Sequence, residues 1–158
     1  MKITFPINHI VPELKGTNGL DVIDELINHL VGAGTISAEN REPIAAAIKQ
    51  RERSMSTGIG LGIALPHGMT HLLNDVVVAF GRSSAGVDFD ALDRQPVRVV
   101  ALMIVPAGQR EKHLKTLTGI SRLLHDQELR NALEVAPDAA AIAQLLNERA
   151  TDRALTRV

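Results

Sequence analysis

The sequence predicts a single α/β domain in which a mixed β-sheet is flanked by helices. Apolar residues recur at helical spacing near both ends of the chain, whereas the middle contains short runs of β-branched residues separated by Gly, Asp, Ser and Pro. A length of 158 residues with 45% apolar content suffices for one sizeable core. Helices, then strands, then helices again indicate helices packed on a sheet. Periodicity leaves the strand order open.

Two helices are predicted in the first third of the chain. The first spans residues 19–32, where Leu20, Ile23, Ile27 and Leu30 form one apolar face. Glycines at 32 and 34 end this helix. Ser37 is the expected N-cap of a second helix that runs to Arg51 and tolerates Pro43 in its first turn.

Strands are predicted at residues 63–65, 76–80 and 97–105, the last of them deeply buried. After these strands the apolar residues recur at helical spacing. Helices are expected over residues 109–124, 128–135 and 137–149.

The polar residues 151–158 follow the last amphipathic face, and we expect them to form a flexible tail.

Charge and composition disfavour several classes of function. The formal net charge is −1, which gives no long-range field to attract nucleic acid or an anionic membrane. The chain contains no cysteine, so disulfides and thiolate sites are excluded. Polar residues and prolines interrupt residues 1–15, and no apolar run is long enough to span a bilayer. We therefore expect a soluble, cytoplasmic protein.

The most informative motif is the glycine-rich segment 56–68, which runs into a short apolar strand and ends at Pro66-His67-Gly68. Glycines permit positive φ angles and close backbone approach, and proline fixes the local backbone. A neutral imidazole is nucleophilic and can accept a phosphoryl group, forming a reactive N–P bond. His67 is therefore the principal candidate for chemistry.

This motif resembles the phosphohistidine motif of the fructose, mannitol and nitrogen-regulatory branch of the IIA proteins in the bacterial phosphoenolpyruvate phosphotransferase system. Further segments similar to that family follow its order along the chain: Arg51-Glu52-Arg53, residues 89–97, and the run from Val105 through Leu117. The resemblance covers residues 5–148, which we take as the domain, and implies a mannitol-type IIA fold.

The resemblance also implies roles for three residues. His67 matches the phosphorylated histidine, His113 the second active-site histidine and Arg51 the active-site arginine. The implied phosphoryl donor is the histidine phosphocarrier HPr or its nitrogen-branch counterpart, and neither a metal nor a nucleotide cofactor is implied. Backbone amides near Gly68 and in the segment 58–62 are further candidates for holding the phosphoryl oxygens.

Each of these residues also admits a purely structural interpretation. His67 alone is compatible with an ordinary surface or core histidine. His113 is compatible with a buried helical histidine packed beside Leu117, and Arg51 with a cation that stabilises the C-terminal dipole of its helix.

Other patterns are weaker. His71 follows His67 by four residues, but Pro66 and Gly68 favour a turn there rather than the helix that a metal site with this spacing requires. Asp88, Asp90 and Asp93 lack the glycine and glutamate of a calcium loop. The glycine run fits neither a dinucleotide fingerprint nor a phosphate loop. His9, His29 and His125 have no surrounding motif.

Three functional hypotheses remain open. The segment 56–60 resembles the nitrogen-regulatory subtype, which would bind sensor kinases or transporters according to its phosphorylation state. A sugar-specific IIA protein would instead pass phosphate to a IIB partner. A third possibility is an interaction module without phosphotransfer, because Leu61 stands where many relatives carry a polar residue such as Asn or Glu.

Overall fold

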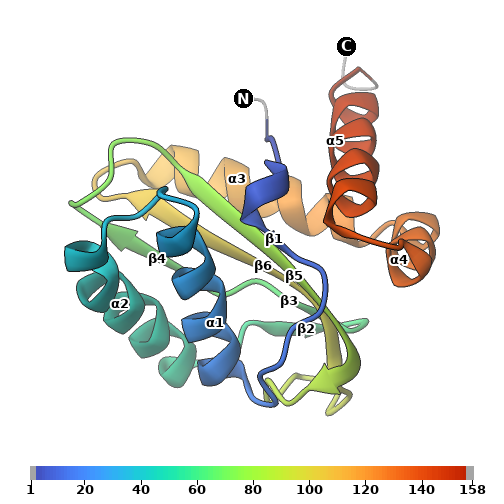
Figure 1. The fold of residues 1–158 in the computed structure, drawn as a ribbon, viewed down its shortest axis with the longest axis horizontal. Coiled ribbons are helices and arrows are strands. Elements are labelled where there is room, and N and C mark those ends of the chain that lie inside the picture. The colour runs from blue at the N-terminus through green and yellow to red at the C-terminus, as the bar shows by residue number, and fades with distance from the viewer. Residues whose placement is uncertain (1–2, 156–158) are drawn as a thin grey trace.

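In the computed structural model, which describes residues 3–155, a mixed six-stranded sheet lies between two layers of helices (Figure 1). The elements in chain order are the 3₁₀ turn η1 (Ile7–His9), β1 (Ile10–Val11), α1 (Gly19–Gly32), the 3₁₀ turn η2 (Ala38–Asn40), α2 (Arg41–Ser54), β2 (Gly58–Gly60), β3 (Ile63–Ala64), β4 (His67–Thr70), β5 (Val77–Val87), β6 (Val97–Pro106), α3 (Arg110–Leu124), α4 (Gln127–Val135) and α5 (Ala139–Leu155). The predicted α/β class with a mixed, helix-flanked sheet is confirmed.

Strand β6 is the centre of the sheet, whose order is β1-β5-β6-β3-β2. It runs antiparallel to β5 on one side and parallel to both β3 and β4 on the other. Ile63 of β3 lies opposite Val99, and His67 of β4 lies opposite Met103. Strands β3 and β4 therefore follow one another along the same side of β6. Among the described residues β4 pairs with no strand other than β6, so it forms a free edge.

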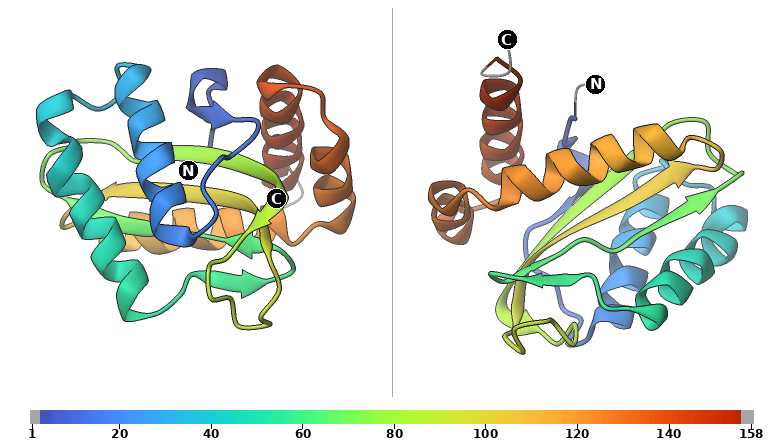
Figure 2. Two further views of the ribbon diagram at one scale, coloured as in Figure 1. Left: turned by 60° about the horizontal axis from the view of Figure 1, so that its bottom comes forward. Right: turned by 180° about the vertical axis from the view of Figure 1, so that it is seen from behind.

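From Val99 onward both faces of β6 are buried, which explains why the sequence is continuously apolar there, whereas Arg98 near the start of the strand is exposed. Val100, Leu102 and Ile104 pack into a core with α1 and α2. The alternating residues Val99, Ala101 and Met103 pack into a second core with α3, α4 and α5. Figure 2 shows α3 crossing the face of the sheet opposite to α1 and α2.

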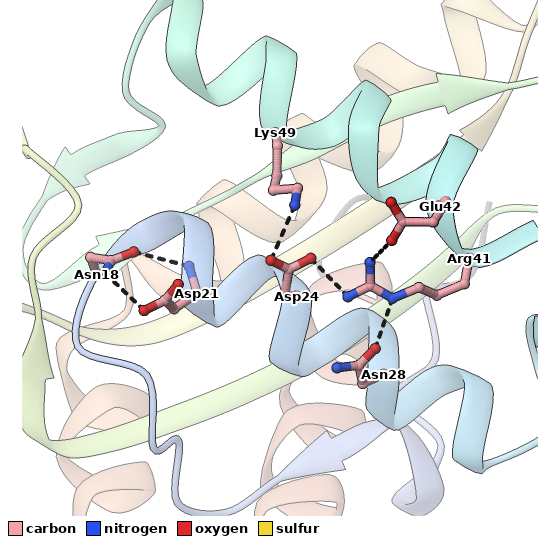
Figure 3. A network of polar contacts seen from close by, with 7 residues as sticks. All are labelled: Asn18, Asp21, Asp24, Asn28, Arg41, Glu42 and Lys49. Atoms are coloured by element: carbon pink, nitrogen blue, oxygen red, sulfur yellow. Dashed lines mark hydrogen bonds and ion pairs between the residues drawn. The ribbon is translucent and has the colours of Figure 1, made fainter.

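A polar network fixes α2 against α1 (Figure 3). Asp24 of α1 accepts hydrogen bonds from Arg41 Nη2 at 2.8 Å and Lys49 Nζ at 3.1 Å. Arg41 Nε also donates to Asn28 Oδ1 at 2.8 Å, and Arg41 pairs with the neighbouring Glu42. These partly exposed ion pairs are individually weak, but Asp24 binds two residues of α2 through its two oxygens, and together these contacts hold α2 beside α1.

The helix predictions differ from the structure mainly at the ends. The helix over 19–32 is confirmed, with Asn18 as its N-cap. Ser37 is not the N-cap of α2. It precedes the turn η2 and makes no capping bond, and α2 begins at Arg41. Pro43 lies in the first turn of α2 as predicted.

The last helix continues to Leu155 rather than ending at Arg149, because no Gly or Pro follows to stop it. Residues 156–158 of the predicted tail lie outside the described residues.

Three short strands were not predicted, namely β1, β2 and β4. The prediction of a turn around Pro66 and Gly68 is wrong, because His67 begins β4, which pairs with β6. Strands of two to four residues carry too few side chains to show an alternating pattern.

The turn between β2 and β3 places Leu61 at φ 61° and Gly62 at φ 76°. Positive φ at both central residues is the type I′ arrangement, which favours Asn-Gly. Leu61 is 56% exposed, so little packing offsets its backbone strain. Leu61 thus occupies a position governed by backbone conformation.

We expect Leu61→Asn to raise the free energy of unfolding by roughly 0.5–1 kcal/mol, since Asn tolerates the left-handed region better than Leu. Urea unfolding of both proteins measures the difference. Leu92→Asn is the matched control, because Leu92 is also exposed but does not have a positive φ angle. A Leu61→Asn protein no more stable than Leu92→Asn would contradict the strain argument.

Candidate functional site

Helix α2 lies directly against the edge strand β4 because Gly68 has no side chain. A Cβ atom at Gly68 would lie 2.9 Å from Ile48 Cγ1 and 3.3 Å from the backbone nitrogen of Ile48. Ile48 is buried in the core between α2 and the sheet. Arg51 follows Ile48 by about one helical turn and therefore lies beside the strand that carries His67.

The backbone holds the ring of His67 in one orientation. Its Nδ1 atom lies 2.8 Å from the carbonyl oxygen of Leu65. A carbonyl only accepts hydrogen bonds, so Nδ1 carries the proton of the neutral ring and Nε2 keeps its lone pair. The carbonyl of the next residue, Pro66, accepts from Met103 N at 2.9 Å, which joins this segment to β6.

His113 approaches His67 from the other layer of helices. It lies in the first turns of α3, and its backbone nitrogen donates to Gln109 O at 3.0 Å. The two imidazole centroids are 5.1 Å apart, with the rings tilted by 53°. His113 is buried, and its Nδ1 has no hydrogen-bond partner among the described residues.

Arg51 completes the group at the C-terminal end of α2. Its Nη1 atom donates to the carbonyl of Met55 at 2.8 Å, which leaves the rest of the guanidinium group for other partners. The three predicted residues line one open hollow of about 520 Å³, together with Ala47, Gln50, Ser54, Gly68 and Met69. The structure thus brings His67, His113 and Arg51 together from three elements distant in sequence.

Both site histidines favour the neutral state. Burial lowers the pKa of His67 below the usual histidine value, and the charge of Arg51 lowers it further, although the hydrogen bond to Leu65 opposes this. Burial also lowers the pKa of His113, as do the charges of His67 and Arg51. At neutral pH the hollow therefore contains two uncharged imidazoles beside one permanent cation.

The structure separates the two predicted backbone contributions: the segment 58–62 lies away from the hollow, whereas amides next to Gly68 remain candidates. The carbonyls of Pro66 and Thr70 accept hydrogen bonds from Met103 and Ala107. Because backbone groups alternate in direction along a strand, those of Gly68 also point to β6. The turn at 58–62 lies beside the start of β6, where Gly62 O accepts from Arg98 N and Val99 N. At about 3.3 Å per residue, this is about 13 Å along β6 from the partner of His67. The backbone groups of His67 and Met69 instead face the open edge of the sheet.

Several residues of the hollow were missed by sequence reasoning. Met69 shares the outward side of β4 with His67, and helical spacing places Ala47, Gln50 and Ser54 along α2 near Arg51. His71 is exposed and does not line the hollow. Within residues 3–155, no cluster of three or more His, Cys, Asp or Glu side chains is placed to hold a metal ion.

His9 has a structural role that the sequence did not indicate. Its Nδ1 donates to Val78 O at 3.0 Å, and its Nε2 lies 2.8 Å from Thr35 Oγ1. The ring therefore joins the N-terminal segment, β5 and the loop after α1. Burial lowers the pKa of His9, and the nearby His29 adds to this effect.

A helix-flanked mixed sheet with two imidazoles and an arginine at its open edge defines an α/β protein with a histidine-centred site. The chain belongs to the family "Phosphoenolpyruvate-dependent sugar phosphotransferase system, EIIA 2", which it matches over residues 4–149. The predicted resemblance is thereby confirmed.

Relatives of known name include both branches of this family. A nitrogen regulatory protein of Bradyrhizobium diazoefficiens is 34% identical over 87% of this chain and 88% of its own. The fructose-specific EIIABC component of Bacillus subtilis is 39% identical over 81% of this chain, which spans only 20% of that larger protein. The crystal structure of IIA-Ntr from Neisseria meningitidis superposes with a TM-score of 0.80 at 26% identity, covering 90% of this chain and 95% of that one.

Across the described residues, none of the helices combines the length and apolar character that crossing a bilayer requires.

We expect Gly68→Ala to lower the free energy of unfolding by about 1–3 kcal/mol, because the added methyl group overpacks the contact with Ile48. Urea unfolding measures this loss. Gly32→Ala is the control: a Cβ at this position in α1 meets nothing within 4 Å, so this variant should be at least as stable as the parent. Equal stability of Gly68→Ala and the parent would contradict the close contact.

Stability should also fall as the pH is lowered. The folded-state pKa values of His9, His67 and His113 lie below the unfolded value of 6.5, so the unfolded chain binds protons more readily. Their contribution is complete above pH 6.5 and is lost as the pH falls through the folded pKa values. Urea unfolding at about pH 7.5 and 5.5 measures the loss, and replacing all three residues by Gln should remove most of it. An unchanged pH dependence in that triple variant would contradict the assignment.

Proposed function

We propose that this protein is a phosphoryl carrier in which Nε2 of His67 accepts a phosphoryl group from the phosphocarrier HPr or its nitrogen-branch counterpart. The N–P bond of the donor's phosphohistidine breaks as a new N–P bond forms at His67, and the donor imidazole takes back the bonding pair. The observation that carries the proposal is the hydrogen bond from Nδ1 to Leu65 O. It leaves the Nε2 lone pair as the nucleophile of a neutral ring.

Arg51 and His113 fit the charge of the transferred group. In phosphoryl transfer the protein contributes mainly positioning and stabilisation of the equatorial oxygens. The guanidinium group supplies a fixed charge with several donors, and His113 reaches the hollow with its ring close to that of His67. No step of this chemistry needs a metal ion or a nucleotide.

A nitrogen-regulatory role is the better supported of the two family roles. The nitrogen regulatory protein of Bradyrhizobium diazoefficiens matches this chain over most of both lengths, and the IIA-Ntr structure matches over nearly all of both chains. In this role, phosphorylation adds negative charge at the edge of the sheet and changes which partners bind, sensor kinases or transporters among them.

The second candidate is a sugar-specific IIA function, favoured by the 39% identity to the fructose-specific EIIABC component. The phosphoryl group would then pass to a IIB domain. The hairpin turn that carries Leu61 lies beside the start of β6, away from the hollow. The cytoplasmic location stays a prediction.

Intact-protein mass spectrometry tests the carrier function after incubation with phosphoenolpyruvate, the first enzyme of the system and HPr. We expect the parent to gain one acid-labile phosphoryl group and His67→Ala to gain none. Arg51→Ala and His113→Ala should accept the group at least tenfold more slowly, since each removes a neighbour of the transferred charge. If the parent gains no phosphoryl group although HPr is fully phosphorylated, the result would favour the phosphorylation-independent interaction module.

Adding a fructose-type IIB domain to the phosphorylated parent distinguishes the two family roles. Rapid discharge to IIB would support the sugar-transport role. Retention of the phosphoryl group would support the regulatory role.

A further inference from the structure

Outside the predicted triad, the acidic side chain of Glu52, which follows Arg51 in α2, is buried. Glu52 is 9% exposed, and Thr57 is 5% exposed. Glu52 Oε1 accepts from Thr57 N at 3.1 Å, and Glu52 Oε2 accepts from Thr57 Oγ1 at 2.7 Å. A buried carboxylate is costly unless donors satisfy it, so this bidentate pairing fixes the loop between the two residues. We call it the Glu52–Thr57 clip.

One branch of contacts leads from the clip to Arg51. The four residues between Glu52 and Thr57 include Met55, whose carbonyl accepts the hydrogen bond from Arg51 Nη1. The side chain of Met55 is 67% exposed and contributes little packing of its own to hold this carbonyl. Ser54 Oγ, at the last residue of α2, donates to Arg51 O at 2.7 Å. The position of the guanidinium group therefore depends on the geometry of the loop that the clip closes.

A second branch leads from the clip to His67. The carbonyl of Thr57 accepts from Leu65 N at 3.2 Å, and the carbonyl of Leu65 accepts from His67 Nδ1. Leu65 comes after the last residue of β3, so the bond to Thr57 holds a peptide unit at the junction between β3 and β4. A shift of Thr57 is therefore transmitted to the acceptor that orients the imidazole.

We propose that Glu52 and Thr57 are positioning residues, and that their clip sets the distance and orientation of Arg51 relative to His67 for phosphoryl transfer. This inference rests on the proposed carrier function. The residues do not line the hollow themselves and act only through Met55 and Leu65. Reaction rates are sensitive to small displacements of such groups, with about 10²-fold lost for a misplacement near 1 Å.

A pair of nearly isosteric variants tests the clip. Thr57→Val keeps the shape and the backbone donor but removes the hydroxyl, whereas Thr57→Ser keeps both donors. We expect Thr57→Val to slow phosphorylation by phosphorylated HPr by at least tenfold and Thr57→Ser to remain within about twofold of the parent. Ile44→Val, a core change in α2 away from the clip, controls for a general loss of stability. Equal rates for Thr57→Val and Thr57→Ser, or a loss in Thr57→Val no larger than in Ile44→Val, would overturn the proposal.

A double-mutant cycle locates the effect. If Glu52 acts through Arg51, Glu52→Gln should slow transfer strongly in the parent and only weakly when Arg51 is already Ala. Fully independent losses in the two backgrounds would overturn that branch of the clip.

Failure of the clip and failure of the carrier function give different results. A parent that HPr does not phosphorylate refutes the carrier function, whatever the variants do. In that case ¹⁵N NMR of the His67 ring and the Arg51 side chain still tests the geometry. Changed signals in Thr57→Val but not in Thr57→Ser support the clip, and unchanged signals in both overturn it.

Discussion

The contact between Gly68 and Ile48 is the constraint on which the site depends. Cores pack at close to crystalline density, so a helix approaches a strand to this distance only where a side chain is missing. The contact places the last turns of α2 beside β4 and thereby brings Arg51 to the histidine at the start of that strand. The network around Asp24 supports this arrangement from the far side, because it fixes α2 along α1 (Figure 3).

The same close packing determines the charge state of the histidines. Burial between α2, the sheet edge and α3 disfavours a second cation beside Arg51, so both imidazoles are neutral where a nucleophile must be. The cost is that Nδ1 of the buried His113 has no hydrogen-bond partner in the described part of the chain. Functional sites commonly keep such unfavourable features, which the rest of the fold must offset. Here the two apolar cores on either side of β6 provide the compensation.

The spacing of apolar residues was sufficient to predict the long helices and strands but not the short strands. The apolar faces of residues 19–32 and 109–124 repeat often enough to identify α1 and α3, whereas β4 contains only His67 to Thr70 and gives no periodic signal. The glycine-rich motif indicated His67, but Arg51 and His113 were identified by resemblance, because the three residues meet only through tertiary packing. For the same reason, the sequence indicated Glu52 only as part of the charged segment Arg51-Glu52-Arg53. Its partner Thr57 lies beyond the C-terminal end of α2, and the sequence does not show that the chain turns back toward the helix there.

Phosphorylation of His67 would reverse the electrostatics of the hollow under the proposed function. In the free protein, His67 and Arg51 both act to lower the pKa of His113. A phosphoryl group on Nε2 places up to two negative charges within reach of the same imidazole, and a nearby anion favours the protonated ring. His113 would then carry a proton and donate a charge-assisted hydrogen bond, which is stronger than one from a neutral ring. A His113 that is neutral before transfer and cationic afterwards would stabilise the phosphorylated state. The unphosphorylated protein would then avoid the cost of holding a second cation beside Arg51.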